Sequence, residues 1–183
     1  MEKKNVELNS KLVQDMREQG DSLVDFILPA TKKYFGNFEL ISAEEELDEV
    51  LESSDLKYKG YIDLVVKTDD GKYHIVDWKT CSWGWDSRRK ADRMTTYQLT
   101  YYKYFFAKKH NIDIDDIETH FALLKRTAKT NRVEFFKVSS GKKKVENALN
   151  LLQKALYNIE RRISIKNRLA CTRCEFFNTE HCR

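Results

Sequence analysis

The alternation of hydrophobic and polar residues predicts a β-hairpin in the first half of the chain. Two runs rich in β-branched and apolar residues, Tyr61–Lys67 and Tyr73–Lys79, flank the turn sequence TDDGK. An Asp-Gly pair is typical of a tight hairpin turn, because glycine adopts positive φ without steric cost. Successive side chains of a strand point to opposite faces of a sheet. The hairpin can therefore present Asp63, Asp77 and Lys79 together, among residues that are otherwise typical of a core.

Similar patterns predict the other elements. Apolar residues at roughly helical spacing predict a helical segment over residues 1–36, with Gly20 and Pro29 as its break and end points. The remaining expected elements are a strand beginning at Phe38–Ile41, a long helix over 88–109, strands at Ile117–Arg126 and Arg132–Ser139, and a helix from Val145 to about Ile163. This order predicts an α/β protein with a mixed central sheet flanked by helices.

Length and composition indicate one folded domain. The 183 residues are enough for a substantial core, and 41% hydrophobic with 34% charged residues is typical of a globular protein. We divide this single domain into an N-terminal helical segment over 1–36, a core over 37–165 and a cysteine-rich tail over 166–183. The chain has no apolar run of membrane-spanning length and no signal-peptide pattern, so we expect no membrane association. We expect a cytoplasmic protein, or one in the host cytoplasm if the gene is viral.

Charge is distributed unevenly along the chain. Residues 1–56 carry a net charge of −8, residues 57–120 carry +2 and residues 121–183 carry +10, within an overall charge of +4. A basic part of this size is suited to a nucleic-acid phosphate backbone. The alternative is that the surface helices are simply charged, and the gradient alone does not exclude it.

The acidic residues of the hairpin suggest a metal site. Burying an unpaired carboxylate is unfavourable by several kcal/mol or more, unless a cation lies between such groups. Mg²⁺ prefers carboxylate oxygens, and a nearby lysine can stabilise a developing oxyanion or hold an attacking water. For any one of Asp63, Asp77 and Lys79, a polar residue at a strand end is the simpler explanation. For the set within one hairpin we favour the metal site.

Four features in this order resemble a known family. Gly60-Tyr61-Ile62-Asp63 precedes the hairpin turn, Asp77-Trp78-Lys79 follows it, Thr80 comes next, and Gln98 lies four residues before Tyr102. This arrangement is similar to that of the PD-(D/E)XK nucleases, in particular to small phage and RecB-like exonucleases of the RecB-type branch. The resemblance covers roughly residues 35–165.

The resemblance implies a restriction-endonuclease-like core and a set of site residues. It implies one or two Mg²⁺ or Mn²⁺ ions held by Glu44, Asp63 and Asp77, where Glu44 is our choice from the run Glu44–Glu46. Lys79 would orient or help to deprotonate the attacking water. Gln98 and Tyr102 are four residues apart on the long helix, so they share a face that can point toward the metals.

Basic and aromatic residues near the hairpin are candidates for nucleic-acid binding. Trp83 and Trp85 flank a glycine and could stack on bases, and the cluster Arg88, Arg89 and Lys90 follows. The alternative is that one tryptophan anchors the loop in the core, and we expect one of each. Lys129, in the basic loop 127–131, is a further candidate contact with DNA.

The C-terminal tail contains three closely spaced cysteines. Cys171, Cys174 and Cys182 have the spacing of metal ligands in a reducing compartment. The tail is similar to that of AddB and CRISPR-associated nucleases, which implies a 4Fe-4S cluster. Their fourth cysteine precedes the nuclease strands, whereas the only other cysteine here is Cys81. Three alternatives remain open: Cys81 is the fourth ligand, His181 completes a zinc site, or the cysteines are a degenerate remnant of a cluster.

The function expected from these features is a metal-dependent deoxyribonuclease. We expect an exonuclease that acts on single-stranded DNA or duplex ends in recombination, repair or viral DNA replication. One alternative is a catalytically weak nucleic-acid-binding module that works with a helicase or recombination partner. Another is a CRISPR-adaptation nuclease. The sequence does not indicate an oligomeric state.

Overall fold

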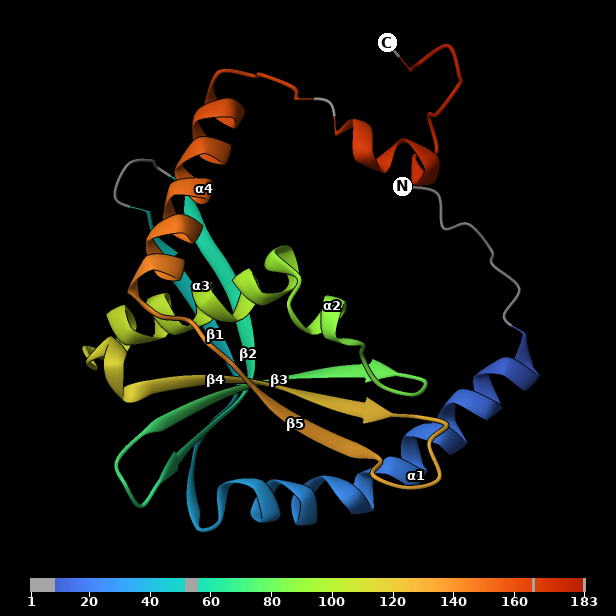
Figure 1. The fold of residues 1–183 in the computed structure, drawn as a ribbon, viewed down its shortest axis with the longest axis vertical. Coiled ribbons are helices and arrows are strands. Elements are labelled where there is room, and N and C mark those ends of the chain that lie inside the picture. The colour runs from blue at the N-terminus through green and yellow to red at the C-terminus, as the bar shows by residue number, and fades with distance from the viewer. Residues whose placement is uncertain (1–8, 52–55, 166, 183) are drawn as a thin grey trace. The chain divides into compact units, whose positions relative to one another are not determined.

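A computed structural model describes residues 9–51, 56–165 and 167–182. By its internal contacts the chain divides into two compact units, residues 1–149 and 150–183. The first unit contains the sheet and the helices that flank it (Figure 1).

The sheet of the first unit is mixed. Its five strands follow the order β1-β2-β3-β4-β5, with β3 and β4 parallel and the other neighbours antiparallel. The strands are β1 Phe38–Val50, β2 Lys57–Thr68, β3 Tyr73–Cys81, β4 Ile117–Lys125 and β5 Val133–Val138. The predicted α/β architecture with a mixed central sheet is therefore confirmed.

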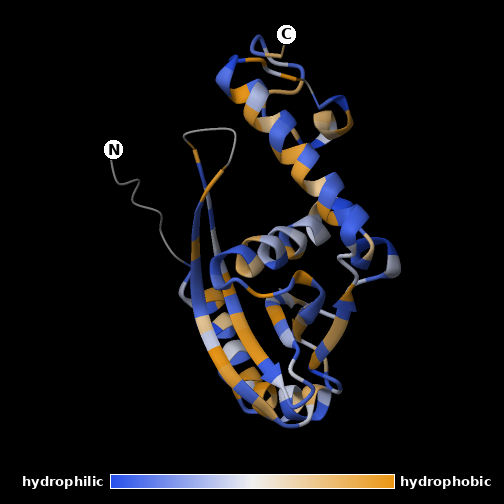
Figure 2. Cartoon of the chain, turned by 90° about the vertical axis from the view of Figure 1, so that its left-hand side faces the viewer, coloured by the Kyte–Doolittle hydropathy of each residue, from blue (hydrophilic) through white to orange (hydrophobic). Residues whose placement is uncertain are grey.

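Two long helices lie on opposite faces of this sheet (Figure 1). Helix α3, Arg93–His110, is the crossover between the parallel strands β3 and β4, and its Phe105 stacks on Tyr58 of β2. Helix α1, Ser10–Phe35, places Tyr34 against Phe135 of β5. Figure 2 shows hydrophobic residues concentrated along the strands, and those with no exposed surface include Val65, Val66, Ile75, Val76 and Phe121.

Helix α1 continues through both residues that we expected to interrupt it. Gly20 and Pro29 lie inside the helix, which ends where Gly36 adopts a φ of 73°. Proline fixes φ at a helical value and removes only one N–H donor, so it can be accommodated within a long helix at a cost. Two residues later the Thr31 hydroxyl donates a hydrogen bond to the carbonyl of Ile27, at 2.8 Å. The expected break and end points were therefore wrong.

The helix expected over 88–109 is two helices. Helix α2, Ser87–Lys90, ends at Ala91, and the Asp92 side chain then caps α3 by accepting a hydrogen bond from the Thr95 amide at 2.7 Å. An aspartate at this position satisfies an amide that has no partner within the helix, so it favours a new helix start over continuation. Strand β1 is also longer than expected, because it contains the acidic run Glu44–Glu46.

The C-terminal part of the chain is mainly helical. Helix α4, Lys142–Glu160, begins in the first unit and starts three residues earlier than expected. The short 3₁₀ helices are η1, Ile114–Asp116, in the first unit and η2, Arg168–Arg173, in the second. No helix within the described ranges combines the length and apolar character needed to cross a membrane.

Candidate active site

The β2–β3 hairpin brings Asp63 close to β3. The turn closes with a hydrogen bond from the Gly71 amide to the Thr68 carbonyl at 2.9 Å, and Gly71 adopts a φ of 84°. Leu64 pairs with Val76, so Asp63 lies across from Asp77. The Trp78 amide donates a hydrogen bond to Asp63 Oδ2 at 2.7 Å. This contact holds one carboxylate oxygen of Asp63 beside the strand that carries Asp77.

The Asp77 carboxyl group is buried in the sheet. The residue is only 2% exposed, and Oδ2 has no hydrogen-bond donor among the described residues. Burial raises the pKa of Asp77 from 3.8 to about 6, and the negative charge of Asp63 acts in the same direction. A buried carboxylate oxygen without a donor, next to a second carboxylate, is suited to a hard divalent cation such as Mg²⁺ or Mn²⁺.

Lys79 places a positive charge beside this carboxylate. Its Nζ lies 2.7 Å from Asp77 Oδ2, at ion-pair distance but outside hydrogen-bond geometry. This ion pair lowers the pKa of Asp77, although burial has the larger effect. Because the Lys79 side chain remains partly exposed, its ammonium group can contact both the buried carboxylate and a molecule from solvent.

Helix α3 adds an amide and a phenol to this region. Gln98 Nε2 donates a hydrogen bond to the Tyr102 hydroxyl at 2.9 Å. Burial raises the pKa of Tyr102, and the charges of Asp77 and Asp63 act in the same direction. The Tyr102 ring packs close to β2, where a Cβ atom added at Gly60 would lie 2.9 Å from it. The structure therefore brings together five of the predicted residues: Asp63, Asp77, Lys79, Gln98 and Tyr102.

The glutamates of β1 differ in their surroundings. The neighbouring strand pairs, Ala43 with Leu64 and Glu45 with Ile62, place Glu44 across from Asp63. Glu44 is exposed and adopts a φ of 52°, and no other described residue forms an ion pair with it. Glu45 contacts Lys109, and Glu46 pairs with Lys59 at 2.9 Å.

The two tryptophans after β3 have different environments. Trp83 is 74% exposed, whereas Trp85 is 8% exposed and packs against Phe121 and Phe136. Trp85 is thus part of the core, which confirms the expectation that one of the two tryptophans anchors the loop. It is not available to stack on a base, so its assignment as a nucleic-acid contact was wrong. The core contacts are nonlocal, since Phe121 and Phe136 lie on β4 and β5.

The basic residues that we expected to contact nucleic acid also differ in their surroundings. Arg88 and Lys129 are exposed, and the Arg89 guanidinium lies 4.5 Å from the Trp85 ring centroid. Lys90 is half-buried and forms an ion pair with Glu134 of β5. An internal ion pair already engages this lysine.

Among the described residues, no group of three or more ligands that could hold a metal ion includes a cysteine. All four are free; Cys81 is buried at the end of β3, and the other three lie in the second unit. Within the described part of the chain, the only group of three or more His, Cys, Asp or Glu residues that could hold a metal ion is His74, Glu118 and His120. The structure thus gives no support to a 4Fe-4S cluster formed by Cys81, Cys171, Cys174 and Cys182.

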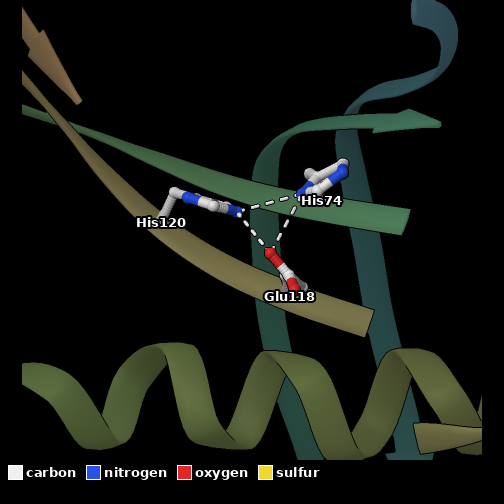
Figure 3. A group of neighbouring side chains, drawn as sticks. All are labelled: His74, Glu118 and His120. Carbon is white, nitrogen blue, oxygen red and sulfur yellow. Dashed lines mark hydrogen bonds and ion pairs between the residues drawn. The ribbon is translucent and has the colours of Figure 1, made fainter. Parts of the chain in front are cut away.

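This His-Glu-His group was not predicted from the sequence. Glu118 and His120 are two residues apart on β4, so they share a face, and His74 lies on the adjacent strand β3 (Figure 3). Burial lowers the pKa of His74 and lowers that of His120 to about 3, so both imidazoles are neutral near pH 7. The two-residue spacing was visible in the sequence, but the meeting with His74 depends on strand pairing.

The mixed five-stranded sheet flanked by helices, with Asp63 on β2 and with Asp77 and Lys79 on β3, is consistent with a restriction-endonuclease-like α/β fold. The family model of the PD-(D/E)XK nuclease superfamily matches residues 3–179, and the chain belongs to this superfamily. It is therefore a nuclease, a hydrolase of nucleic acids from a superfamily that uses divalent metal ions.

Solved structures have related folds. A protein from Eubacterium rectale, named "Putative exonuclease", matches with a TM-score of 0.56 and 14% identity over 94% of this chain and 62% of that one. This chain thus spans less than two thirds of that protein's length. The protein SSO0001 matches with a TM-score of 0.48 and 16% identity, over 92% of this chain and 68% of that one. At 14% identity the likeness to the Eubacterium rectale protein concerns the fold alone. No curated protein matches the chain.

Proposed function

We propose that this protein is a Mg²⁺- or Mn²⁺-dependent deoxyribonuclease of the RecB-type branch that acts as an exonuclease. The observation that carries the proposal is the Asp77 carboxylate, which is buried, lacks a hydrogen-bond donor at Oδ2 and has Lys79 Nζ 2.7 Å away. A carboxylate this deeply buried, with the second carboxylate of Asp63 across the strand pair, is suited to hold a divalent cation. The hydrogen bond between Gln98 and Tyr102 supports the RecB-type assignment.

Each residue has a distinct part in the proposed reaction. Asp63 and Asp77 would hold the divalent ion, with Glu44 as an additional ligand from β1. The bound ion supplies Lewis-acid stabilisation of the charge that develops on the phosphate. Lys79 would orient the attacking water through its ammonium group and stabilise the negative charge that develops in the transition state. Gln98 and Tyr102 hydrogen-bond the phosphate or an ordered water, and the Trp78 amide keeps Asp63 in position.

Exposed residues beyond β3 are suited to bind the DNA. Trp83 offers a free aromatic face, and Arg88 and Lys129 offer exposed positive charge. The name of the structural relative from Eubacterium rectale supports exonuclease action. DNA ends or single strands produced in recombination, repair or viral replication are the substrates we propose.

Substitutions at Asp77 and Lys79 test this function. We expect Asp77→Ala and Lys79→Ala to reduce cleavage of labelled single- and double-stranded DNA by about a thousandfold, because each removes a charge needed in the transition state. Circular dichroism and DNA-binding titrations should show that both variants remain folded and bind DNA. Lys57→Ala, which removes an exposed lysine paired with Asp48, is the matched control and should cleave normally.

Wild-type turnover in either variant would rule out this assignment. If the wild-type protein bound DNA but did not cleave it at any Mg²⁺ or Mn²⁺ concentration, the alternative of a binding module that works with a partner would be favoured.

For the tail we propose a separate metal group. The support is the Cys171-x2-Cys174 spacing followed by Cys182, which is characteristic of soft-metal ligands. If the group is an iron–sulfur cluster, anaerobically purified protein should contain iron and show the visible absorption of such a cluster. If the group is a zinc ion, the protein should contain zinc and show no such absorption. Cys171→Ser with Cys174→Ser should remove the metal, whereas Cys81→Ser should do so only if Cys81 is a ligand. Metal-free wild-type protein would contradict the proposal.

A further inference from the structure

A second group of metal-ligand side chains lies outside the proposed catalytic residues. His74 of β3 and Glu118 and His120 of β4 point toward one another (Figure 3). His74 Nδ1 is 3.1 Å from His120 Nε2, and Glu118 Oε2 lies 3.8 Å and 4.0 Å from these two nitrogens. Both imidazoles are buried, so their nitrogens require partners.

Hydrogen bonds determine which nitrogen of His74 carries the proton. The Thr68 hydroxyl donates its only proton to the Asp70 carboxylate, which as an ionised group can only accept. Thr68 Oγ1 also lies 2.9 Å from His74 Nε2, so at this contact the hydroxyl oxygen must accept and Nε2 must donate. A neutral His74 therefore has its lone pair on Nδ1, the atom that faces His120 and Glu118.

His120 can place its proton on either side. Its Nδ1 lies 3.2 Å from the Tyr34 hydroxyl, which can donate or accept. Without a metal, His120 Nε2 donates to His74 Nδ1 and Tyr34 donates to His120 Nδ1. If the proton moves to Nδ1 and is donated to Tyr34, then Nε2 also has a free lone pair. One tautomer change thus converts the hydrogen-bonded pair into two nitrogen ligands.

The geometry of the three atoms fits a transition-metal ion. A point equidistant from them lies about 2.1 Å from each, close to the zinc–nitrogen and zinc–oxygen distances of about 2.0–2.2 Å. Hydroxyl oxygens hold the outer nitrogens of both imidazoles, as expected for metal-binding histidines. The group lines a cleft of 450 Å³, which has room for a water as a further ligand.

The charged residues around the group have opposing effects on the binding of a cation. Lys72 and Lys137 pair with the other oxygen of Glu118, Oε1, at 3.3 Å and 2.6 Å. They leave Oε2 directed at the histidines, but their positive charges disfavour a cation. Asp69 and Asp70 line the same cleft and oppose this effect.

We propose that His74, Glu118 and His120 form a binding site for a divalent transition-metal ion of the zinc type, separate from the carboxylate site at Asp63 and Asp77. Two imidazoles with one carboxylate favour zinc and similar ions over Mg²⁺. The ion would join β3 to β4 and, through the hydrogen bond from His120, would stabilise the contact with Tyr34 of α1.

Zinc titration calorimetry on full-length protein tests the site. The background is Asp77→Asn with all three tail cysteines changed to serine, because both other candidate sites could bind zinc. We expect one zinc per chain and little Mg²⁺ binding. His74→Gln, Glu118→Gln and His120→Gln should each weaken zinc binding at least about tenfold. His110→Gln and His181→Gln are matched controls and should not. No zinc binding in the background, or equal binding in folded His74→Gln and His120→Gln, would refute the site.

Nitrogen-15 NMR of the imidazoles supplies a test without substitution of the ligands. In the same background, zinc should move the His120 proton from Nε2 to Nδ1, while His74 keeps its proton on Nε2. If His120 does not change its tautomer when zinc is added, the proposal is wrong. Tyr34→Phe should weaken zinc binding, because it removes the oxygen that accepts the proton from His120 Nδ1.

Discussion

The carboxyl group of Asp77 lies in the interior of the sheet, where its charged form is unfavourable. Its pKa of about 6 means that the folded protein binds a proton at this site more tightly than the unfolded chain, in which the value is near 3.8. The stabilisation from this proton is fully present below pH 3.8 and is lost as the pH rises through 6. The proposed catalytic state therefore reduces the stability of the metal-free fold.

Chemical denaturation in EDTA can measure this effect. The wild-type free energy of unfolding should fall relative to that of Asp77→Asn as the pH rises from 4 to 7, by on the order of 2–3 kcal/mol. Asparagine cannot ionise, so it isolates the contribution of the carboxyl group. Addition of Mn²⁺ at pH 7 should reduce the difference. Parallel stability curves for the two proteins would contradict the burial of a charged Asp77.

Gly60 allows β2 to approach helix α3 closely. A Cβ atom at this position would lie 2.9 Å from the Tyr102 ring and 3.3 Å from the Tyr58 ring. We expect Gly60→Ala to destabilise the protein by about 1–3 kcal/mol and to lower activity, because the Tyr102 ring must move. Thermal unfolding and cleavage assays would measure both effects.

Gly20→Ala is the matched control for Gly60→Ala. An added Cβ at Gly20 meets nothing within 4 Å, and alanine favours the helix by about 1 kcal/mol. This control should therefore raise stability. Equal effects of the two substitutions would show that the contact with Tyr102 is unimportant.

At the scale of elements, Glu134 connects β5 to β4 and to α2. Its two carboxylate oxygens pair with Lys125, which is 6% exposed, and with Lys90 of α2. We expect Glu134→Gln to destabilise the protein by about 2–4 kcal/mol, because it leaves the Lys125 charge buried without its partner. Urea denaturation measures the loss. Glu146→Gln, at an exposed position of α4, should change stability little.

The type and order of the elements could be predicted because hydrophobic periodicity is a local property. The Asp70-Gly71 turn and the alternation on both sides of it were sufficient for the β2–β3 hairpin. The break between α2 and α3 was missed because a single capping residue, Asp92, interrupts an otherwise helical pattern. The continuation of α1 through Pro29 could not be predicted from the local preference of proline to end a helix.

At the scale of the whole molecule, features that depend on pairing between distant segments were the least predictable. Asp63 and Asp77 could be brought together from the hairpin alone. The meeting of His74 with His120 depends on the parallel register of β3 and β4, which α3 separates along the chain. The burial of Trp85 likewise depends on aromatic residues of β4 and β5.

Strand β1 lies at one end of the strand order, so its outer backbone groups have no partner strand in the sheet. An open edge of thirteen residues is a template for pairing with another chain. This strand contains six acidic residues and no basic one, so two copies brought edge to edge would repel each other. The edge is thus protected from self-association.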